Sequence, residues 1–258
     1  MLSLSHFEEN VKRMFDDLAP RYDLLNRLNS YGLDAHWRKA LVGTVTKEDP
    51  ELILDLAAGT GEVTIALARE NPDSVVVAAD LSPQMLYQTL YKALRRGYAE
   101  RVKIAEADAL SLPFEDDHFD ALTCAFGVRN FENLPRGLDE MFRVLAPGGI
   151  CAILELCEPV SPLANRLYQF HTRETIPFVA RLAGSNPESY RYLRRSIAGM
   201  PSREDMELLM RESGFRHTYY KVFLPGVACL YVGYKARFNE EMIRIKERYS
   251  GMLARHPR

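Results

Sequence analysis

The sequence predicts an α/β fold: a mostly parallel sheet with helices on both faces. Two observations carry this prediction. Short apolar runs alternate with helical patterns from residue 51 onward, which is typical of successive β–α–β units. Two further apolar runs flank Pro225-Gly226, which predicts that the last two strands form an antiparallel hairpin. The fold class is therefore an open sheet buried on both faces, with one antiparallel addition.

Each element has its own signal along the chain. Pro83 suits the first turn of a helix, and Pro147-Gly148-Gly149 ends another. Ser202-x-x-Asp205 resembles a capping box for a helix that ends at Gly214. The expected strands of this seven-stranded sheet are residues 52–56, 75–79, 102–105, 122–126, 150–156, 219–224 and 227–234. The expected helices between them are residues 62–70, 83–96 and 134–145.

The chain of 258 residues is long enough for one large domain, and no internal repeat divides it. The expected segments of this single domain are an N-terminal helical lid (1–50), a ligand-binding core (51–160), an aromatic and basic helical insert on the substrate side (161–200), a helix and hairpin (201–235), and an amphipathic helix (236–258).

Composition excludes several classes of protein. A net charge of -2 argues against a broad nucleic-acid-binding face. No apolar run approaches the roughly 18 residues of a membrane span, and the charged N-terminal residues are unlike a secretory signal, so we expect a cytoplasmic protein. The four cysteines lack metal-ligand spacing. We interpret them as small core residues and expect no metal.

The segment DLAAGTGEVT, residues 55–64, joins the first strand to the first helix of the core. Gly59 and Gly61 let the backbone approach a ligand closely, and the helix start offers free N–H groups. Asp80 ends the next strand, where a carboxylate can accept from two ribose hydroxyls. A dinucleotide is one possible ligand, but Thr64 occupies the third glycine position of that fingerprint. The pattern favours an adenosine-containing ligand.

Asp108 and Ala109 follow the third strand, where a carboxylate can accept from an adenine amine. The series from Asp55 to Gly149 resembles the class I S-adenosylmethionine-dependent methyltransferases, which have a Rossmann-like fold. The flanks narrow the resemblance to the menaquinone/ubiquinone C-methyltransferases. The stretches that carry it are residues 15–26 (FDDLAPRYDLLN), SYGL at 30–33, Trp37-Arg38, FGVRN at 126–130, Leu154-Glu155, SYRYLRRS at 189–196 and GYK at 233–235.

This resemblance implies S-adenosylmethionine as methyl donor, S-adenosylhomocysteine as product and a prenylated quinol as substrate. The implied cofactor-binding residues are Asp55, Ala58, Gly59, Thr60, Gly61, Asp80, Leu81, Met85, Asp108, Ala109 and Ala125. Two positions depart from the family pattern. The family usually has Ser where this chain has Ala125, and its final strand usually carries His and Arg where this chain has Cys229-Leu-Tyr231-Val-Gly.

AFGVRNF, residues 125–131, ends the fourth strand beside the implied methyl group. We expect Gly127 to allow a turn and to bring Arg129 and Asn130 to the reacting atoms. Ring-carbon methylation needs an electron-rich ring, and a guanidinium can stabilise a phenolate because it is permanently charged. Arginine is a poor base, so the proton goes elsewhere. The candidate acceptors are water, Tyr22, Asp23 and His171.

Three alternatives stay open at this point. The chain could methylate another small molecule; a nucleic-acid substrate is disfavoured, because the Asn-Pro-Pro-aromatic motif of nucleic-acid amino-methyltransferases is missing after the fourth strand. It could be a non-catalytic S-adenosylmethionine-binding partner subunit. It could also be a nicotinamide oxidoreductase.

The stretch ARFNEEMIRIKERYSGMLARHPR, residues 236–258, predicts an amphipathic helix. Its apolar residues recur at spacings of three and four and share one face: Phe238, Met242, Ile245, Tyr249 and Met252. Its basic residues outnumber its acidic ones, which favours anionic lipid. This face either docks on the inner surface of the membrane or packs on the protein's own body or a second subunit of a homodimer.

Overall fold

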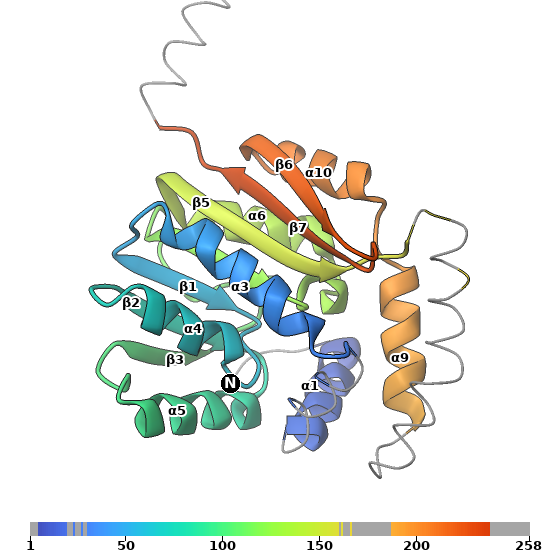
Figure 1. Ribbon diagram of the computed structural model, residues 1–258, viewed down its shortest axis with the longest axis horizontal. Helices are drawn as coiled ribbons and strands as arrows, with labels where there is room; N and C mark the ends of the chain where they lie inside the picture. Colours follow the sequence, from blue (N-terminus) through green and yellow to red (C-terminus); the bar gives the residue numbers. More distant parts are fainter. Residues whose placement is uncertain are drawn as a thin grey trace, which may run out of the picture.

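The computed structural model describes residues 5–19, 30–159 and 187–237, together with residues 23, 27, 161 and 166. Within these ranges, seven strands form one sheet in the order β3-β2-β1-β4-β5-β7-β6 (Figure 1). Only β7 runs antiparallel to its neighbours, β5 and β6, which confirms the predicted parallel sheet with a terminal hairpin. The strands are β1 (Leu52–Leu56), β2 (Val75–Asp80), β3 (Val102–Glu106), β4 (Phe119–Ala125), β5 (Leu145–Leu156), β6 (Arg216–Phe223) and β7 (Ala228–Tyr234).

Helices surround the sheet, and their boundaries follow the local signals in the sequence. Ser82 caps the helix that begins at Pro83, and Gly97 ends that helix in the left-handed conformation. The Ser202 side chain accepts from the Asp205 N–H, as the capping motif predicts. The helices are α1 (His6–Leu18), α3 (Leu33–Thr46), α4 (Glu62–Glu70), α5 (Pro83–Arg96), the 3-10 helix η2 (Val128–Asn130), α6 (Leu134–Val144), α9 (Pro187–Ala198) and α10 (Arg203–Glu212).

Two layers of side chains hold the helices on the sheet. On one face, α3 and α4 bury residues such as Trp37, Leu41 and Leu67 against the strands. On the other, α6 and α10 bury residues such as Met141 and Met206 (Figure 1). Full burial of each such side chain stabilises the fold by about 1.5–3 kcal/mol. All four cysteines are free and buried, which confirms their interpretation as core residues.

Strand β5 begins earlier than the sequence predicts. We expected a strand from residue 150, after a glycine stop, whereas Leu145 already pairs with Phe119 of β4 and the register then shifts before Ile150 pairs with Ala121. Gly148 has φ +90° within this irregular stretch. A Cβ on Gly149 would lie 2.8 Å from the Asp120 carbonyl oxygen. The glycines that end α6 therefore also let the chain bulge inside the sheet without leaving it.

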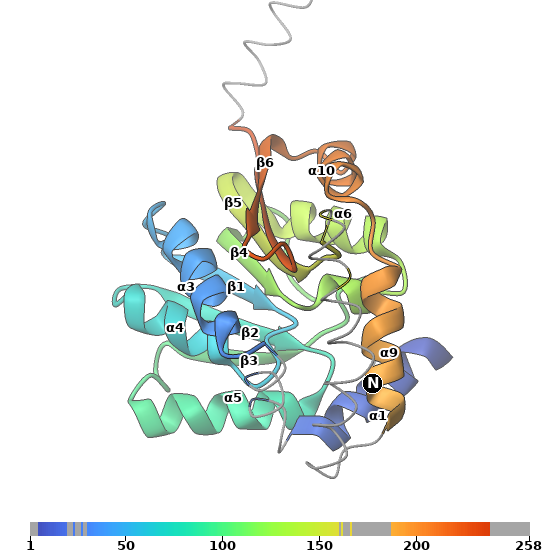
Figure 2. The same ribbon diagram turned by 45° about the vertical axis from the view of Figure 1, so that its right-hand side comes forward.

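The carboxyl ends of β1, β2, β3 and β4 meet at one edge of the sheet, and α1 and α9 lie next to one another beside that edge (Figures 1 and 2). Three side-chain contacts tie α1 to the loops and strands there. Ser5 Oγ donates to Glu132 (2.6 Å), Lys12 Nζ donates to Glu106 (2.6 Å), and the Ser82 hydroxyl donates to Asp16 (2.5 Å). Helix α1 thus covers the edge where a ligand is expected.

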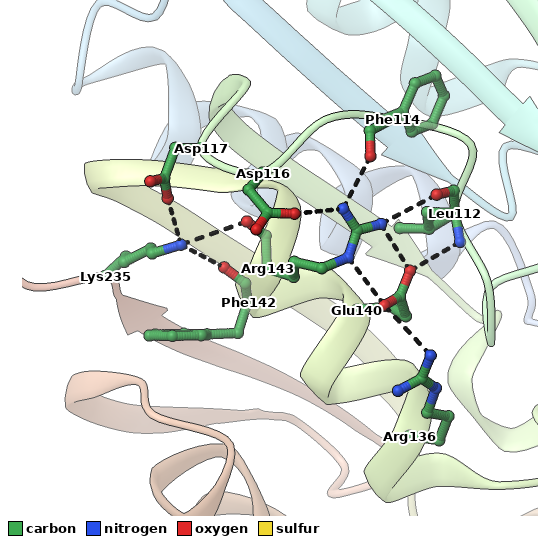
Figure 3. A network of polar contacts seen from close by, with 9 residues as sticks. All are labelled: Leu112, Phe114, Asp116, Asp117, Arg136, Glu140, Phe142, Arg143 and Lys235. Atoms are coloured by element: carbon green, nitrogen blue, oxygen red, sulfur yellow. Dashed lines mark hydrogen bonds and ion pairs between the residues drawn. The ribbon is translucent and has the colours of Figure 1, made fainter.

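A separate polar network fastens the loop before β4 to α6 (Figure 3). The Arg143 guanidinium pairs with Glu140 (2.7 Å) and Asp116 (2.7 Å), and donates to the carbonyl oxygens of Leu112 (2.9 Å) and Phe114 (2.8 Å). The hydrogen bond from Arg143 is the main reason why the pKa of Glu140 lies below its usual value. Four acceptor residues around one cation hold the loop firmly against α6.

Candidate active site

A pocket opens at the carboxyl edge of the sheet, between the strand-following loops and α1. Its empty space, which includes open solvent, is about 730 Å³. Helix α1 contributes Glu8, Val11 and Phe15 to its wall. Of the residues that the sequence implicated, the structure brings eight together in this wall: Gly59, Asp80, Leu81, Met85, Asp108, Ala109, Ala125 and Asn130.

The glycine loop after β1 shapes one side of this pocket. Gly61 has φ +82°, and a Cβ there would lie 2.7 Å from two atoms of the Thr89 side chain. The Thr89 hydroxyl in turn donates to the Gly59 carbonyl oxygen (2.8 Å). Gly61 is absent from the described lining of the pocket, so its role in the structure is to let the loop close against α5.

Asp80, at the end of β2, is aimed into the pocket by two backbone donors. The Gly59 N–H donates to Oδ2 (2.8 Å) and the Ser82 N–H donates to Oδ1 (2.9 Å). Burial raises the pKa of this carboxyl, and the two backbone hydrogen bonds oppose that shift. Each carboxylate oxygen keeps a further acceptor position, so Asp80 can still bind two ribose hydroxyls.

Asp55, inside β1, has a different environment. Its side chain is 1% exposed and accepts from the hydroxyls of Thr64 (2.6 Å) and Thr123 (2.8 Å). Burial raises its pKa to about 6, although both hydroxyls act in the opposite direction. Sequence reasoning missed both threonines. Thr64 was noted only as the residue that breaks a dinucleotide fingerprint, and here it holds the acid that begins the loop.

Asp108 and Met85 form another part of the pocket wall. The Leu110 N–H donates to Oδ1 of Asp108 (2.8 Å), which fixes the carboxylate after β3. Met85 is 1% exposed at the start of α5 and presents an apolar surface with Leu81 and Ala109. One acid between apolar walls is the arrangement that a flat aromatic base with an exocyclic amine requires.

The segment AFGVRNF borders the pocket beside the glycine loop. The expected turn falls one residue before Gly127, because Phe126 has φ +60° whereas Gly127 has φ -105°. Gly127 is needed for space: a Cβ there would lie 2.6 Å from the Ala57 Cβ and 2.7 Å from the Cys124 sulfur. The glycine therefore serves close packing of the two loops at this turn.

Arg129 lies behind this segment in a buried ion pair. Its Nη1 atom is 2.8 Å from Oε1 of Glu155, and the two side chains are 6% and 1% exposed. Nη1 also donates to the Phe126 carbonyl oxygen, and the Arg129 N–H donates to Oε2 of Glu155 (3.2 Å). In the sequence, Glu155 stands out only as part of the Leu154-Glu155 stretch. It anchors η2 to β5 and sets the position of the residues that follow Phe126.

Asn130 faces the pocket and is oriented from the other side by α9. The Tyr192 hydroxyl donates to Oδ1 of Asn130 (3.1 Å), and burial raises the pKa of that phenol. Nδ2 of Asn130 donates to the Phe126 carbonyl oxygen (3.4 Å). The SYRYLRRS segment thus reaches the candidate site through Tyr192, a contact between elements that are distant in the sequence.

The candidate proton acceptors are only partly placed. Tyr22 and His171 lie outside the described residues. Asp23 accepts from the Thr60 hydroxyl (2.5 Å) and pairs with Lys92 (2.6 Å). Among the described residues, no group of three His, Cys, Asp or Glu side chains is arranged to hold a metal ion, and a metal-free reaction stays a prediction.

S-adenosylmethionine fits this donor set. The glycine loop offers a backbone cradle, Asp80 offers ribose acceptors, and Asp108 offers an acceptor between apolar walls. The loop can hold that shape only without a side chain at Gly61, since a Cβ would collide with Thr89. The geometry therefore suits an adenosine with a further group that extends toward Ala125 and Gly127.

Comparison with known proteins decides the family. The model of the ubiE/COQ5 methyltransferase family matches residues 4–235. The chain belongs to the ubiE/COQ5 methyltransferase family. It is accordingly an S-adenosylmethionine-dependent methyltransferase of the Rossmann-like class I fold, as the resemblance implied.

Individual relatives agree with this assignment. The chain is 42% identical over 220 residues to a demethylmenaquinone methyltransferase of Thermus thermophilus, which covers 85% of this chain and 99% of the relative. It is 40% identical over 236 residues to the ubiquinone/menaquinone biosynthesis C-methyltransferase UbiE of Geobacter sulfurreducens, which covers 91% of this chain and 92% of that one.

Solved structures at lower identity share the fold alone. A SAM dependent methyltransferase from Aquifex aeolicus superimposes with a TM-score of 0.54 at 16% identity, over 76% of this chain and 89% of that one. The [4+2]-cyclase SpnF superimposes with a TM-score of 0.60 at 17% identity, over 89% and 97%. Because the second of these proteins is named a cyclase, the fold alone does not determine the reaction.

Proposed function

We propose that this chain transfers a methyl group from S-adenosylmethionine to a ring carbon of a prenylated quinol, and that its reaction converts a demethylmenaquinol into a menaquinol. The benzoquinol of the ubiquinone pathway is a second substrate of the same kind. Support comes from the names of the relatives at 42% and 40% identity, and from one observation in the structure. The pocket that fits the cofactor continues along Ala125, Phe126, Gly127 and Asn130 to Phe131.

In this proposal Asp80 binds the ribose and Asp108 the adenine, with Leu81, Met85 and Ala109 as apolar walls. Ala58, Gly59, Thr60 and Ala125 give close approach to the remaining part of the ligand. Both acids accept backbone N–H groups in the structure, which supports the assignment because each carboxylate is already oriented before a ligand arrives. Preorganised acceptors lose little conformational freedom on binding.

S-adenosylmethionine supplies a methyl group that is already strongly electrophilic when it is bound. The task left for the protein is to align an electron-rich ring carbon with that methyl group and to exclude water. Asn130, held by Tyr192 and by the Phe126 carbonyl oxygen, borders the space where the ring would lie. Phe131 and Phe126 add apolar surface that suits an aromatic quinol.

Arg129 stabilises the quinol phenolate in this proposal. The guanidinium is already paired with Glu155, so its field at the pocket is that of an ion pair and its position is fixed by two partners. The same pair holds η2 in place, which gives Arg129 a positioning role for Asn130 as well. The proton from the quinol hydroxyl passes to water, Tyr22, Asp23 or His171.

The test is a direct assay. The protein is incubated with methyl-labelled S-adenosylmethionine and a panel of reduced naphthoquinols and benzoquinols, and mass spectrometry locates the label. Label on the ring carbon of a demethylnaphthoquinol is the expected result. Label on oxygen, or on no quinol of the panel while S-adenosylmethionine binds, would contradict the proposed substrate.

The alternatives receive no comparable support. Thr64 donates to Asp55 where a dinucleotide fingerprint has a glycine, which disfavours a nicotinamide cofactor. A non-catalytic partner subunit has no need for a substrate space beside the cofactor pocket. If the protein methylates no quinol of the panel but does methylate another small molecule, only its assignment as a methyltransferase would stand.

No helix in the described part of the chain is long and apolar enough to cross a membrane. A prenylated quinol resides in the bilayer, so we infer that the protein works at the inner face of the membrane, from the cytoplasm. The proposed docking helix spans residues 236–258, of which 238–258 lie outside the described residues, as does any contact in a homodimer. Flotation with anionic liposomes tests the docking role: deletion of residues 237–258 should abolish flotation and spare activity on a short-tailed quinol.

A further inference from the structure

A second, smaller cavity adjoins the main pocket at the glycine loop. Its empty space, which includes open solvent, is about 340 Å³, and it shares Ala57, Gly59, Ala125 and Phe126 with the main pocket. The two cavities therefore meet along the loop after β1 and the end of β4. A ligand with an adenosine at one end and a short polar chain at the other could occupy both.

Arg38 of α3 lines this second cavity, and its charge is incompletely satisfied. The side chain is 14% exposed, and Nη2 lies 3.3 Å from Oδ2 of Asp34 one turn earlier. That separation exceeds the usual 2.7–2.9 Å of a charge-assisted hydrogen bond. Nε of Arg38 is buried and has no hydrogen-bond partner among the residues that the structure describes.

Phe126 holds the guanidinium in place. The Arg38 Cζ atom lies 5.3 Å from the centre of the Phe126 ring, a cation–π distance, and the edge of Trp37 packs on the same ring. Phe126 itself has the uncommon φ of +60°. The sequence of β4 and its loop therefore places an aromatic platform under a cation at the junction of the two cavities.

The acidic groups that line the cavity already have partners. Asp55 accepts two threonine hydroxyls, and Glu62 pairs with Lys92 (2.5 Å). The first turn of α4 adds backbone N–H groups without a side-chain cap at Gly61. Among the described lining residues Arg38 is the cation, and its ion pair with Asp34 leaves N–H donors for an anionic group of a ligand.

We propose that Arg38 binds the α-carboxylate of the methionine portion of S-adenosylmethionine, an inference that rests on the proposed function. The adenosine occupies the main pocket, and the amino-acid end passes Gly59 into the second cavity. The guanidinium has five N–H donors. The ion pair with Asp34 leaves other N–H donors that can bind a carboxylate. Arg38 is then a binding residue for the methyl donor and has no contact with the quinol.

The experiment measures ligand affinity and needs no turnover. Isothermal titration compares S-adenosylmethionine with decarboxylated S-adenosylmethionine, which keeps the sulfonium and the adenosine and lacks only the carboxylate. Wild-type protein should bind the decarboxylated ligand about 10- to 100-fold more weakly, the range for loss of a hydrogen bond to a charged group. Equal affinity of wild-type protein for both ligands would overturn the proposal.

Arg38→Met keeps the aliphatic contact with Phe126 and removes the charge. It should lower the affinity for S-adenosylmethionine about 10- to 100-fold and change the affinity for the decarboxylated ligand less than about threefold. An equal loss for both ligands would mean that Arg38 only shapes the loop, and no loss for either would mean that it makes no contact. Arg38→Lys keeps the charge and should lose less than Arg38→Met.

Arg95→Met is the matched control. Like Arg38, Arg95 has its guanidinium over an aromatic ring, with Cζ 5.8 Å from the centre of Tyr91, but it lies on α5 outside both cavities. This variant should bind both ligands as the wild type does. If wild-type protein fails to bind S-adenosylmethionine at all, the proposed function fails. If it binds both ligands equally, only the assignment of Arg38 fails.

Discussion

Two arginine–glutamate pairs in this molecule have opposite surroundings. Arg143 and Glu140 are 30% and 6% exposed and belong to a network with Asp116 and two backbone carbonyl oxygens (Figure 3). Arg129 and Glu155 are 6% and 1% exposed and lie behind the candidate active site. The first pair closes a loop at low desolvation cost. The second is buried beside a ligand pocket, where removal of charges from water costs several kcal/mol per ion.

The two pairs differ in how much free energy is lost when their charges are removed from water, and the pKa shifts of nearby acids show the same difference. The acids next to the pocket, Asp55 and Asp80, have a pKa raised by burial, whereas the pKa of Glu140 is lowered by its arginine. Charges at the ligand edge are held at some expense of stability, and charges in the Arg143 network contribute stability. We expect substitutions at the ligand edge to affect activity and pH dependence, and substitutions in the network to affect stability alone.

Arg129→Gln should have the largest effect. Loss of a preorganised cation near the developing phenolate lowers turnover by about 10²–10³-fold. Affinity for S-adenosylhomocysteine should stay nearly unchanged, because Arg129 is absent from the described lining of both cavities. Steady-state kinetics and titration calorimetry measure the two quantities. Arg143→Gln is the matched control and should retain turnover; normal turnover of Arg129→Gln would end the phenolate assignment.

Asp55→Asn should change the pH dependence of stability. The folded-state pKa of Asp55 is about 6 against 3.8 unfolded, so the native state binds more protons between these values. Asp55 therefore stabilises most below about pH 4 and loses that contribution as pH rises through 6, about 3 kcal/mol in all. In urea unfolding from pH 4 to 7, the free energy of unfolding of the variant should rise relative to that of the wild type. Parallel curves would contradict the raised pKa.

Asp80→Ala should lower the affinity for S-adenosylhomocysteine by about 10- to 100-fold, since a buried charged hydrogen bond contributes about 1.5–3 kcal/mol. Calorimetry measures this loss. The control is Asp116→Ala, in the Arg143 network, whose carboxylate is largely exposed and pairs with Arg143. Unchanged affinity in Asp80→Ala would reject the ribose assignment.

Arg143→Gln should have the smallest effect, a loss of about 1–2 kcal/mol in the free energy of unfolding with no change in ligand affinity. The loss should shrink as pH falls, because the lowered pKa of Glu140 contributes stability only while that carboxylate is ionised. Chemical denaturation at pH 7 and pH 4 tests this. A variant that binds S-adenosylhomocysteine more weakly would mean that the network and the pocket are coupled.

The parallel sheet could be predicted because its signals are local: apolar runs, Pro83 at a helix start, and glycines at helix ends. The positions of Asp80 and Asp108 could be predicted too, because parallel strands bring their carboxyl ends to one edge. The division of the chain into its five segments, and the roles of the site residues, stay predictions.

Other features depend on contacts that the sequence does not encode locally. Glu155 meets Arg129 only because β4 and β5 are neighbours in the sheet. Arg38 reaches the glycine loop from α3, which precedes the core. The positive φ of Phe126 and the close packing of Gly127 on Ala57 likewise depend on how the two loops meet.

The wall that α1 gives to the pocket has a consequence for dynamics. Side-chain contacts that tie α1 to the loops, such as Lys12 with Glu106, lie near the surface, and surface ion pairs contribute at most about 1 kcal/mol each. Their strength falls with ionic strength. Amide hydrogens of α1 should therefore exchange with solvent well before those of β1, and faster at 1 M salt than at 0.05 M. Residence time of a ligand in the pocket would then depend on the salt concentration, although no charge on the ligand meets Lys12.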